Sequence, residues 1–256
     1  MLAASEFGFK HRFWIIGAIF FVAFLSYNLD PQNAGAAVTE WIARLCGSTA
    51  TTTDYHLTFA IAALFAVAAA LVRTSATAYL NPEVMMDSQV QTSRLVADGP
   101  YRYVRNPLYF GNILLAAGFG LMASRIGFFI LVVGMIVFCY RLILREEAGI
   151  AASQGDSYRA YCAAVPRLLP ALRPKLPPAG SKPNWADGLL GEVFMWVLAA
   201  SVIAFAVTLN QKVYFVVLAF SFLFYAVCLA IISRRRKSHG AGTEGNAAEG
   251  PAKRAG

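Results

Sequence analysis

Apolar residues recur along the chain in six stretches, each flanked by polar or charged residues. A helix needs about 20 mostly apolar residues to cross the hydrocarbon core of a bilayer. The pattern therefore predicts an all-α, polytopic transmembrane helical bundle of about six spans. The second and third stretches are short or rich in glycine, so five spans are the alternative. The stretches are 13–29, 57–72, 107–123, 126–144, 189–209 and 213–232.

Lys and Arg gather on alternate loops of this six-span arrangement. They precede the first stretch, separate the second from the third, separate the fourth from the fifth, and follow the last, where Arg234, Arg235, Arg236 and Lys237 lie. The other loops hold only Arg44, Arg125 and Lys212. Under the positive-inside rule, six spans place both termini in the cytosol, whether the membrane is a bacterial inner membrane or the endoplasmic reticulum.

Three segments qualify this plan. The first stretch, followed by the small residues 33–37, also has features of a cleavable signal peptide, so retention and cleavage both stay open. Residues 166–183 are rich in proline and basic side chains and predict an extended strap at the level of the lipid headgroups. We expect a membrane-embedded domain over 1–237 and a disordered, Gly/Ala-rich tail over 238–256.

Composition narrows the class of protein further. Hydrophobic residues make up 58% of the 256 residues, charged residues only 14%, and mean hydropathy is +0.55, which excludes an ordinary soluble domain. The net charge is +8, but the basic residues lie beside the apolar runs and not in a separate polar domain, so we expect no nucleic-acid partner. The four Cys and three His are scattered, so we expect no metal site.

The segment most suited to chemistry begins at a turn, Asp98-Gly99-Pro100, and leads to the third apolar stretch. Asn106-Pro107 predicts a helix start, with Asn as the cap and Pro at the first helical position. Arg105 and Asn106 would then lie at the positive end of the helix dipole, a place that suits a carboxylate. The alternative is an ordinary interfacial belt of tyrosines with anchoring arginines.

The order of residues in this segment resembles a known family. Gly-Pro-Tyr-Arg-Tyr-Val-Arg-Asn-Pro-Leu-Tyr-Phe-Gly (99–111) is similar to the signature of the isoprenylcysteine carboxyl methyltransferase and phospholipid methyltransferase family. A second block follows, with Glu146-Glu147, then Gly155-x-x-Tyr-x-x-Tyr, then Val165-Pro166 and Pro170. The family-like core spans 84–172, and the first two and last two spans share with the family only their apolar character.

The resemblance implies an integral membrane methyltransferase that uses S-adenosylmethionine. It assigns cofactor contacts to Ser93, Arg94, Leu95, Val96, Tyr101, Asn106, Pro107, Leu108, Tyr109 and Glu146. Ser93 and Asn106 stand where the family often has His. Neighbouring residues on a helix point about 100° apart, so Glu146 and Glu147 are not both expected to face one pocket. Glu147 is expected to be solvated or to pair with a basic residue of the strap.

The expected catalytic residues are Arg105, Arg141 and Glu147. Arg141 lies within an apolar run, where it either snorkels to the surface or binds a substrate carboxylate. Glu192, near the start of the fifth stretch, has the same two interpretations and is a weaker candidate for a functional residue. A carboxylate acceptor, as in an isoprenylcysteine-type small molecule or protein, needs only orientation, by Arg105, Arg141 or Arg145. A phosphatidylethanolamine-type amine needs a base, for which Glu147 is the candidate.

Other classes remain as alternatives. A membrane reductase of the sterol type, or a non-catalytic relative, shares the C-terminal architecture that the resemblance implies. It would bind a nicotinamide cofactor in place of S-adenosylmethionine. The Glu146-Glu147 block argues against this class. The sequence identifies neither the methyl acceptor nor the oligomeric state.

Overall fold

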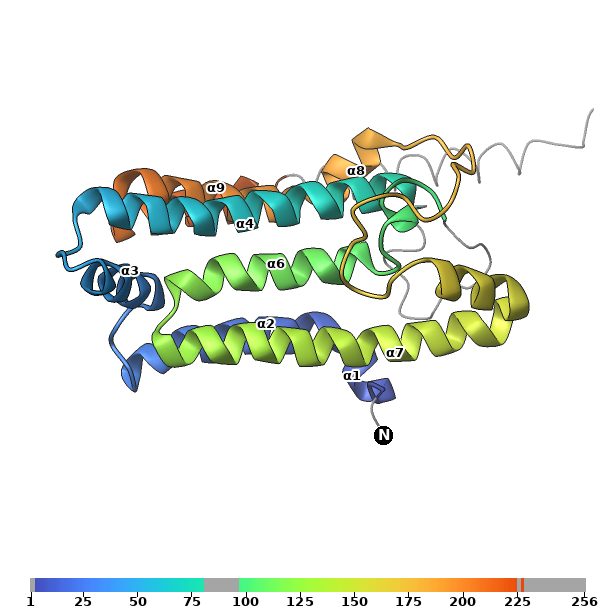
Figure 1. Ribbon diagram of the computed structural model, residues 1–256, viewed down its shortest axis with the longest axis horizontal. Helices are drawn as coiled ribbons and strands as arrows, with labels where there is room; N and C mark the ends of the chain where they lie inside the picture. The colour runs from blue at the N-terminus through green and yellow to red at the C-terminus, as the bar shows by residue number, and fades with distance from the viewer. Residues whose placement is uncertain (1–2, 81–96, 225–226, 228–256) are drawn as a thin grey trace, which may run out of the picture.

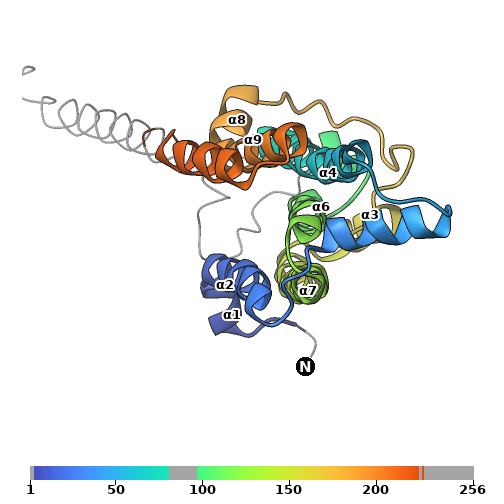
Figure 2. The same ribbon diagram turned by 90° about the vertical axis from the view of Figure 1, so that its left-hand side faces the viewer.

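The computed structural model describes residues 3–80, 97–224 and 227. Its long helices run side by side, with α4 and α9 forming one layer, α6 the middle, and α2 with α7 the opposite layer (Figures 1 and 2). The expected all-α class is confirmed for this part of the chain, which contains no strand. The predicted contacts Ser93 to Val96 and the predicted tail 238–256 lie outside the described residues.

The helices of the described residues follow one another along the chain, and a long non-helical strap joins the helix that ends at Ala164 to the one that begins at Trp185. In chain order they are α1 (Glu6–Lys10), α2 (Arg12–Leu25), η1 (Ser26–Asn28), α3 (Ala34–Leu45), α4 (Thr52–Tyr79), η2 (Gly99–Arg102), α6 (Pro107–Met122), α7 (Arg125–Ala164), α8 (Trp185–Gly191) and α9 (Val193–Thr208). A further apolar helix, Gln211–Phe224, follows α9. Each of the six predicted apolar stretches thus contains helix.

Some of these helices are long enough to span a membrane by themselves, and others are shorter. Within the described residues, α4 and α7 are long and apolar enough, and α8 with α9 makes a third candidate, bent by 62°. The segments Arg12–Asn28, Pro107–Met122 and Gln211–Phe224 are apolar but shorter. Large apolar side chains such as Trp14 and Phe220 are exposed on the outside of the bundle. Such a surface suits lipid, and the protein is an integral membrane protein.

Helix α4 is longer than the predicted stretch 57–72 at both ends. At its start, Thr51 and Asp54 form a capping box, which satisfies the first free N–H groups of the helix. At its other end the helix continues past Arg73, the first of the basic residues that the sequence pattern assigns to the loop between the second and third stretches. That assignment is wrong, because Arg73 is only 8% exposed and has its partners inside the bundle.

Helix α3 was not predicted as a helix. It begins after Asn33, whose side chain accepts a hydrogen bond from the backbone N–H of Ala36. Figure 2 looks along the long helices, and α3 runs across them at one end of the bundle. Its 12 residues combine small buried positions with exposed Trp41 and Leu45. A helix of this length escapes a search for apolar runs of membrane-spanning length.

Small residues let α4 and α6 pack closely in the middle of the bundle. Ala62, Ala66 and Ala69 of α4 are fully buried. A Cβ added at Gly118 of α6 would lie 2.6 Å from the carbonyl oxygen of Ala62. One added at Gly111 would lie 2.5 Å from Cγ of Arg73. The glycine that ends the family-like signature therefore makes room for a buried arginine.

Candidate active site

The loop before α6 is held by the strap that follows α7. The backbone N–H of Arg105 donates to the carbonyl of Pro166 at 2.9 Å, and that of Ala171 donates to Tyr103 at 2.9 Å. Further along, Lys175 N–H donates to the carbonyl of Arg102 at 2.8 Å. These bonds satisfy backbone groups of two irregular segments at once. The predicted extended strap is confirmed as a non-helical segment, and it fixes the loop.

Asp98 fastens the far end of the strap. Its carboxylate accepts hydrogen bonds from the backbone N–H of Ser181 at 2.8 Å and of Gly99 at 3.1 Å. The hydrogen bond from Ser181 is the main reason that the pKa of Asp98 is lowered from its ordinary value. Gly99 has φ of 53°, and a side chain there would also overlap the ring of Tyr79. The turn at Asp98-Gly99-Pro100 therefore requires glycine at its second position.

Helix α7 is folded back on itself at Gly155. This residue has φ of 56° and ψ of −125°, a conformation that L side chains rarely adopt. The second arm carries Tyr158 and Tyr161, which are both buried. The hydroxyl of Tyr161 donates to the carbonyl of Tyr101 at 2.8 Å. The two family-like blocks are thereby brought into contact.

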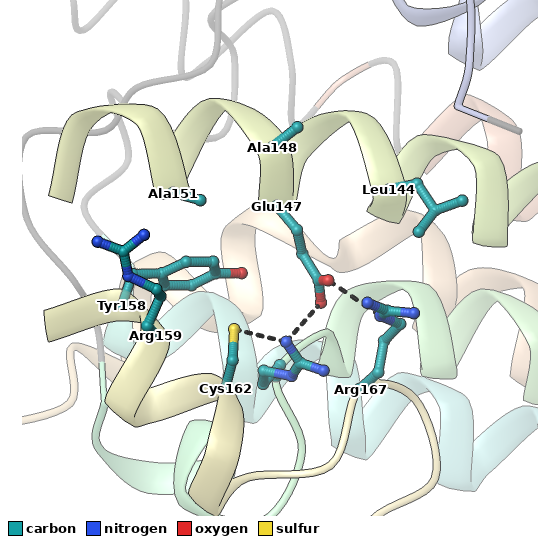
Figure 3. Close-up of a pocket in the computed structure, with 9 residues that line it drawn as sticks. Leu144, Glu147, Ala148, Ala151, Tyr158, Arg159, Cys162 and Arg167 are labelled. Carbon is teal, nitrogen blue, oxygen red and sulfur yellow. Dashed lines mark hydrogen bonds and ion pairs between the residues drawn. The ribbon is translucent and has the colours of Figure 1, made fainter. Parts of the chain in front are cut away.

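A cluster of charges centres on Glu147, which is 8% exposed. One carboxylate oxygen lies 3.2 Å from Nη1 of Arg105 and accepts from Nδ2 of Asn106 at 3.1 Å. The other accepts from Nε of Arg167 at 2.9 Å. Figure 3 shows this pair, with Glu147 on the first arm of α7 and Arg167 on the strap. Of the two alternatives for Glu147, solvated or paired with a basic residue of the strap, the structure shows the second.

Glu146 faces another part of the bundle. Its carboxylate accepts a hydrogen bond of 2.7 Å from the hydroxyl of Tyr109 on α6. Ala4, Phe9 and Leu142 form a small apolar cluster against the ring of Tyr109. As helical geometry requires, the two adjacent glutamates have separate partners. Tyr109 and Glu146, 37 residues apart in the sequence, lie in direct contact.

The remaining predicted cofactor residues cluster at the start of α6. Pro107 occupies the first helical position, as expected, and is buried. Asn106 stands at the cap position, but the prediction that its side chain caps the helix is wrong. Its amide donates instead to Glu147 and to the carbonyl of Arg167 at 3.0 Å. The carbonyl of Leu108 accepts from Arg73 at 3.3 Å, and Tyr101 is 8% exposed.

Arg141 and Arg145, in the first arm of α7, differ in their contacts. Arg141 is exposed, and within the described structure its side chain makes no hydrogen bond or ion pair with the Glu147 cluster. Arg145 donates to the carbonyl of Ala4 at 3.2 Å and lies over the ring of Phe9. The N-terminal segment is thus attached to α7 close to Glu146. Substrate binding by Arg141 stays a prediction.

A buried ion pair in the bundle was not foreseen as a pair. Nε and Nη2 of Arg73 donate to the two oxygens of Glu192 at 2.7 and 2.9 Å, and Thr77 donates to the same carboxylate at 2.8 Å. Nη1 of Arg73 donates to Asn112 at 2.9 Å. Glu192 is fully buried at the bend between α8 and α9. Each of the two residues is a single charge beside or within an apolar stretch of sequence. This is the feature by which the sequence could have indicated that they are buried and paired.

A cavity of about 410 Å³ opens between the two arms of α7. Figure 3 shows an apolar wall from the first arm facing polar side chains from the second arm and the strap. None of the predicted cofactor residues with described positions lines it. The lining residues are Arg105, Leu144, Glu147, Ala148, Ala151, Tyr158, Arg159, Cys162 and Arg167.

Comparison with known proteins supports the class that these residues indicate. Residues 57–153 match the model of the phospholipid methyltransferase family. The resemblance to membrane methyltransferases of this kind is therefore confirmed. The match includes α4 from residue 57, so the expectation that the second span lies outside the resemblance is wrong, and it ends before the second arm of α7. No curated protein and no solved structure shows significant similarity.

Proposed function

We propose that this protein transfers a methyl group from S-adenosylmethionine to a lipid-like acceptor, with both molecules meeting at the end of the bundle that carries Glu146 and Glu147. One observation carries the proposal. Tyr109 and Glu146, which the resemblance assigns to the cofactor from two separate blocks, are joined by a hydrogen bond of 2.7 Å. The family match over 57–153 supports the methyltransferase class independently.

The residues on this side fit the cofactor chemically. Glu146 offers a carboxylate to ribose hydroxyls or to an ammonium group, and the aromatic rings of Tyr101 and Tyr109 suit a planar base or a sulfonium cation. When bound, S-adenosylmethionine supplies an electrophilic methyl group. The protein then has to hold the acceptor in line and to exclude water. The predicted contacts of Ser93, Arg94, Leu95 and Val96 belong to the same proposal.

The acceptor that we favour is a carboxylate, as in an isoprenylcysteine-type substrate. A carboxylate is already deprotonated at neutral pH, so no base is required. Arg141 is exposed and is our candidate to orient it through paired hydrogen bonds. Arg105 and Glu147 are proposed to act as positioning residues, because their cluster holds Asn106 at the start of α6.

Methylation of a phospholipid amine is the second candidate, favoured by the match to the phospholipid methyltransferase family. An ammonium headgroup must first lose a proton. The oxygens of Glu147 already accept from Arg105, Asn106 and Arg167, which leaves little room for a proton from substrate. For this reason we place the amine route second. We also propose six spans, with both termini on the basic side.

Cofactor binding tests the proposal. Glu146→Gln and Glu146→Ala are expected to weaken the affinity for S-adenosylmethionine, measured by calorimetry in detergent, by about tenfold or more. Glu40 of α3 is a matched control, because its carboxylate also accepts a hydrogen bond from a tyrosine hydroxyl. The donor is Tyr55, near the start of α4, at 3.3 Å. Glu40→Gln should leave affinity unchanged. Equal affinity in all three variants contradicts the proposed cofactor site.

A further inference from the structure

We propose that the cavity between the arms of α7 binds the phosphate of an anionic membrane phospholipid, held as an accessory ligand and not as the methyl acceptor. The chemistry of the two walls points to this class of ligand. Three arginines and one glutamate line the cavity, leaving two positive charges in excess. The opposite wall is apolar, from Leu144, Ala148 and Ala151. An anionic head joined to an apolar body matches both.

Arg105 supplies the most specific observation. Its side chain is only 10% exposed, and its Nε is buried without a hydrogen-bond partner among the described residues. A buried guanidinium N–H without a partner is costly and is normally satisfied by a ligand or by water. Nη1 of the same residue is already held by Glu147 and by Sγ of Cys162. Nε is itself buried, so an anion in the cavity reaches it only after a small shift of the Arg105 side chain, and this unsatisfied donor favours such a shift.

The other two arginines stand at the more exposed part of the lining. The Arg167 side chain is 35% exposed and bonds to Glu147 and to the hydroxyl of Tyr140. The Arg159 side chain is 73% exposed, and its partner Asp156 is 95% exposed, so water screens that pair strongly. A negatively charged phosphate can therefore bind Arg159 with little loss of free energy from breaking the exposed pair with Asp156. Phosphate oxygens suit guanidinium groups, which donate in pairs.

The neighbouring strap favours a lipid as the source of the phosphate. Leu169 and Leu172 are 74% and 102% exposed, and they alternate with Arg167, Arg173 and Lys175. Exposed leucines between basic residues are typical of segments that lie at an anionic membrane surface. A cavity of about 410 Å³ is large enough for a headgroup with its glycerol, while the acyl chains stay outside.

The position of the cavity separates this ligand from the proposed reaction. Glu147 lines it, whereas Glu146 and Tyr109 do not. An anion bound beside Arg105 therefore lies on the Glu147 side of α7 and not at the contact of Tyr109 with Glu146, and among the proposed cofactor residues with described positions Asn106 is the one that contacts Glu147. The bound lipid would tie together the strap, the second arm of α7 and the loop before α6.

Calorimetry of the full-length protein in a nonionic detergent tests this site with three probes: dihexanoyl phosphatidylglycerol, dihexanoyl phosphatidylcholine and inorganic phosphate. We expect saturable binding of phosphatidylglycerol and at least about tenfold weaker binding of the other two. Arg159→Gln should weaken phosphatidylglycerol binding by about tenfold, and Ala151→Phe, which fills the cavity from an exposed position, should remove it. The control Arg173→Gln, outside the cavity, should change nothing.

Three results would overturn the proposal. They are the absence of saturable phosphatidylglycerol binding, inorganic phosphate binding as tightly as the lipid, and equal weakening by Arg159→Gln and Arg173→Gln. Glu146→Ala should keep the lipid affinity while losing cofactor affinity. Failure of the proposed function therefore remains distinguishable, because it leaves lipid binding intact and removes only S-adenosylmethionine binding.

Discussion

The hydroxyl of Tyr161 donates a hydrogen bond of 2.8 Å to the backbone carbonyl of Tyr101, across 60 residues of sequence. Tyr101 lies in the loop before α6, and Tyr161 in the arm of α7 that folds back after Gly155. Both side chains are buried. This contact, with the strap, fixes the loop that leads into the proposed cofactor residues.

Removal of this contact should loosen the loop. Tyr161→Phe deletes only the hydroxyl and leaves the carbonyl of Tyr101 without that donor, so we expect a loss of about 1 to 2 kcal/mol in the free energy of unfolding. Thermal unfolding in detergent measures the change. Tyr103→Phe, in the same loop, is the control and should be neutral, since the Tyr103 side chain makes no hydrogen bond within the described structure. An equal loss in both variants would show that the contact has no special role.

The buried pair of Arg73 and Glu192 should respond in a non-additive way. Glu192→Ala leaves the Arg73 guanidinium buried without its carboxylate, which costs about 3 to 5 kcal/mol of stability. Replacing both residues by methionine removes both charges, so the double variant should be more stable than either single variant. Melting midpoints of the wild type, the single variants Arg73→Met and Glu192→Met, and the double variant measure this coupling. Additive losses would mean that the two residues do not act as a pair.

The fold of α7 should depend on glycine at position 155. Ala in place of Gly155 must adopt φ of 56° and ψ of −125°, so we expect a loss of roughly 1 to 3 kcal/mol. The control is Gly17→Ala in α2, where an added Cβ meets nothing within 4 Å and helix propensity improves. If the two substitutions have the same effect on the unfolding midpoint, the reversal at Gly155 does not require glycine.

Asp98 should make the strap sensitive to acid. The pKa of Asp98 in the folded protein is lowered, so its carboxylate contributes stability above the unfolded value of about 3.9, and this contribution is lost as the pH falls through the folded value. Asp98→Asn keeps the shape but removes the charge. Its melting midpoint should lie below that of the wild type at pH 7, and the difference should shrink below about pH 4. A difference that persists unchanged at low pH contradicts this assignment.

Much of this architecture follows from local patterns. Apolar runs indicated the long helices, the Asn-Pro pair marked the start of α6, and the prolines after residue 165 indicated a non-helical strap. The charge on Glu147 and the basic strap made their pairing one of two expectations, the other being a solvated Glu147. These features depend on neighbours in the sequence or on single charges that must find an opposite charge.

Other features depend on contacts between distant segments. Arg73 and Glu192 are 119 residues apart, and only packing of α4 against the α8–α9 bend brings them together. Asn106 has the residue type of a helix cap, yet its Nδ2 donates to Glu147 and to the carbonyl of Arg167, and in this orientation its side-chain oxygen accepts no hydrogen bond from the helix N–H groups. The cavity exists because α7 reverses at Gly155, which the helical periodicity on either side does not reveal.

Methyl transfer itself tests the central claim most directly. The purified protein in vesicles should be incubated with S-adenosylmethionine labelled on its methyl group and, separately, with a farnesylcysteine analogue or phosphatidylethanolamine. We expect label in the lipid fraction of one of these acceptors, and loss of that label in Glu146→Ala but not in Glu40→Gln. A well-folded protein that transfers no label to either acceptor, or a Glu146→Ala variant as active as the wild type, contradicts the account.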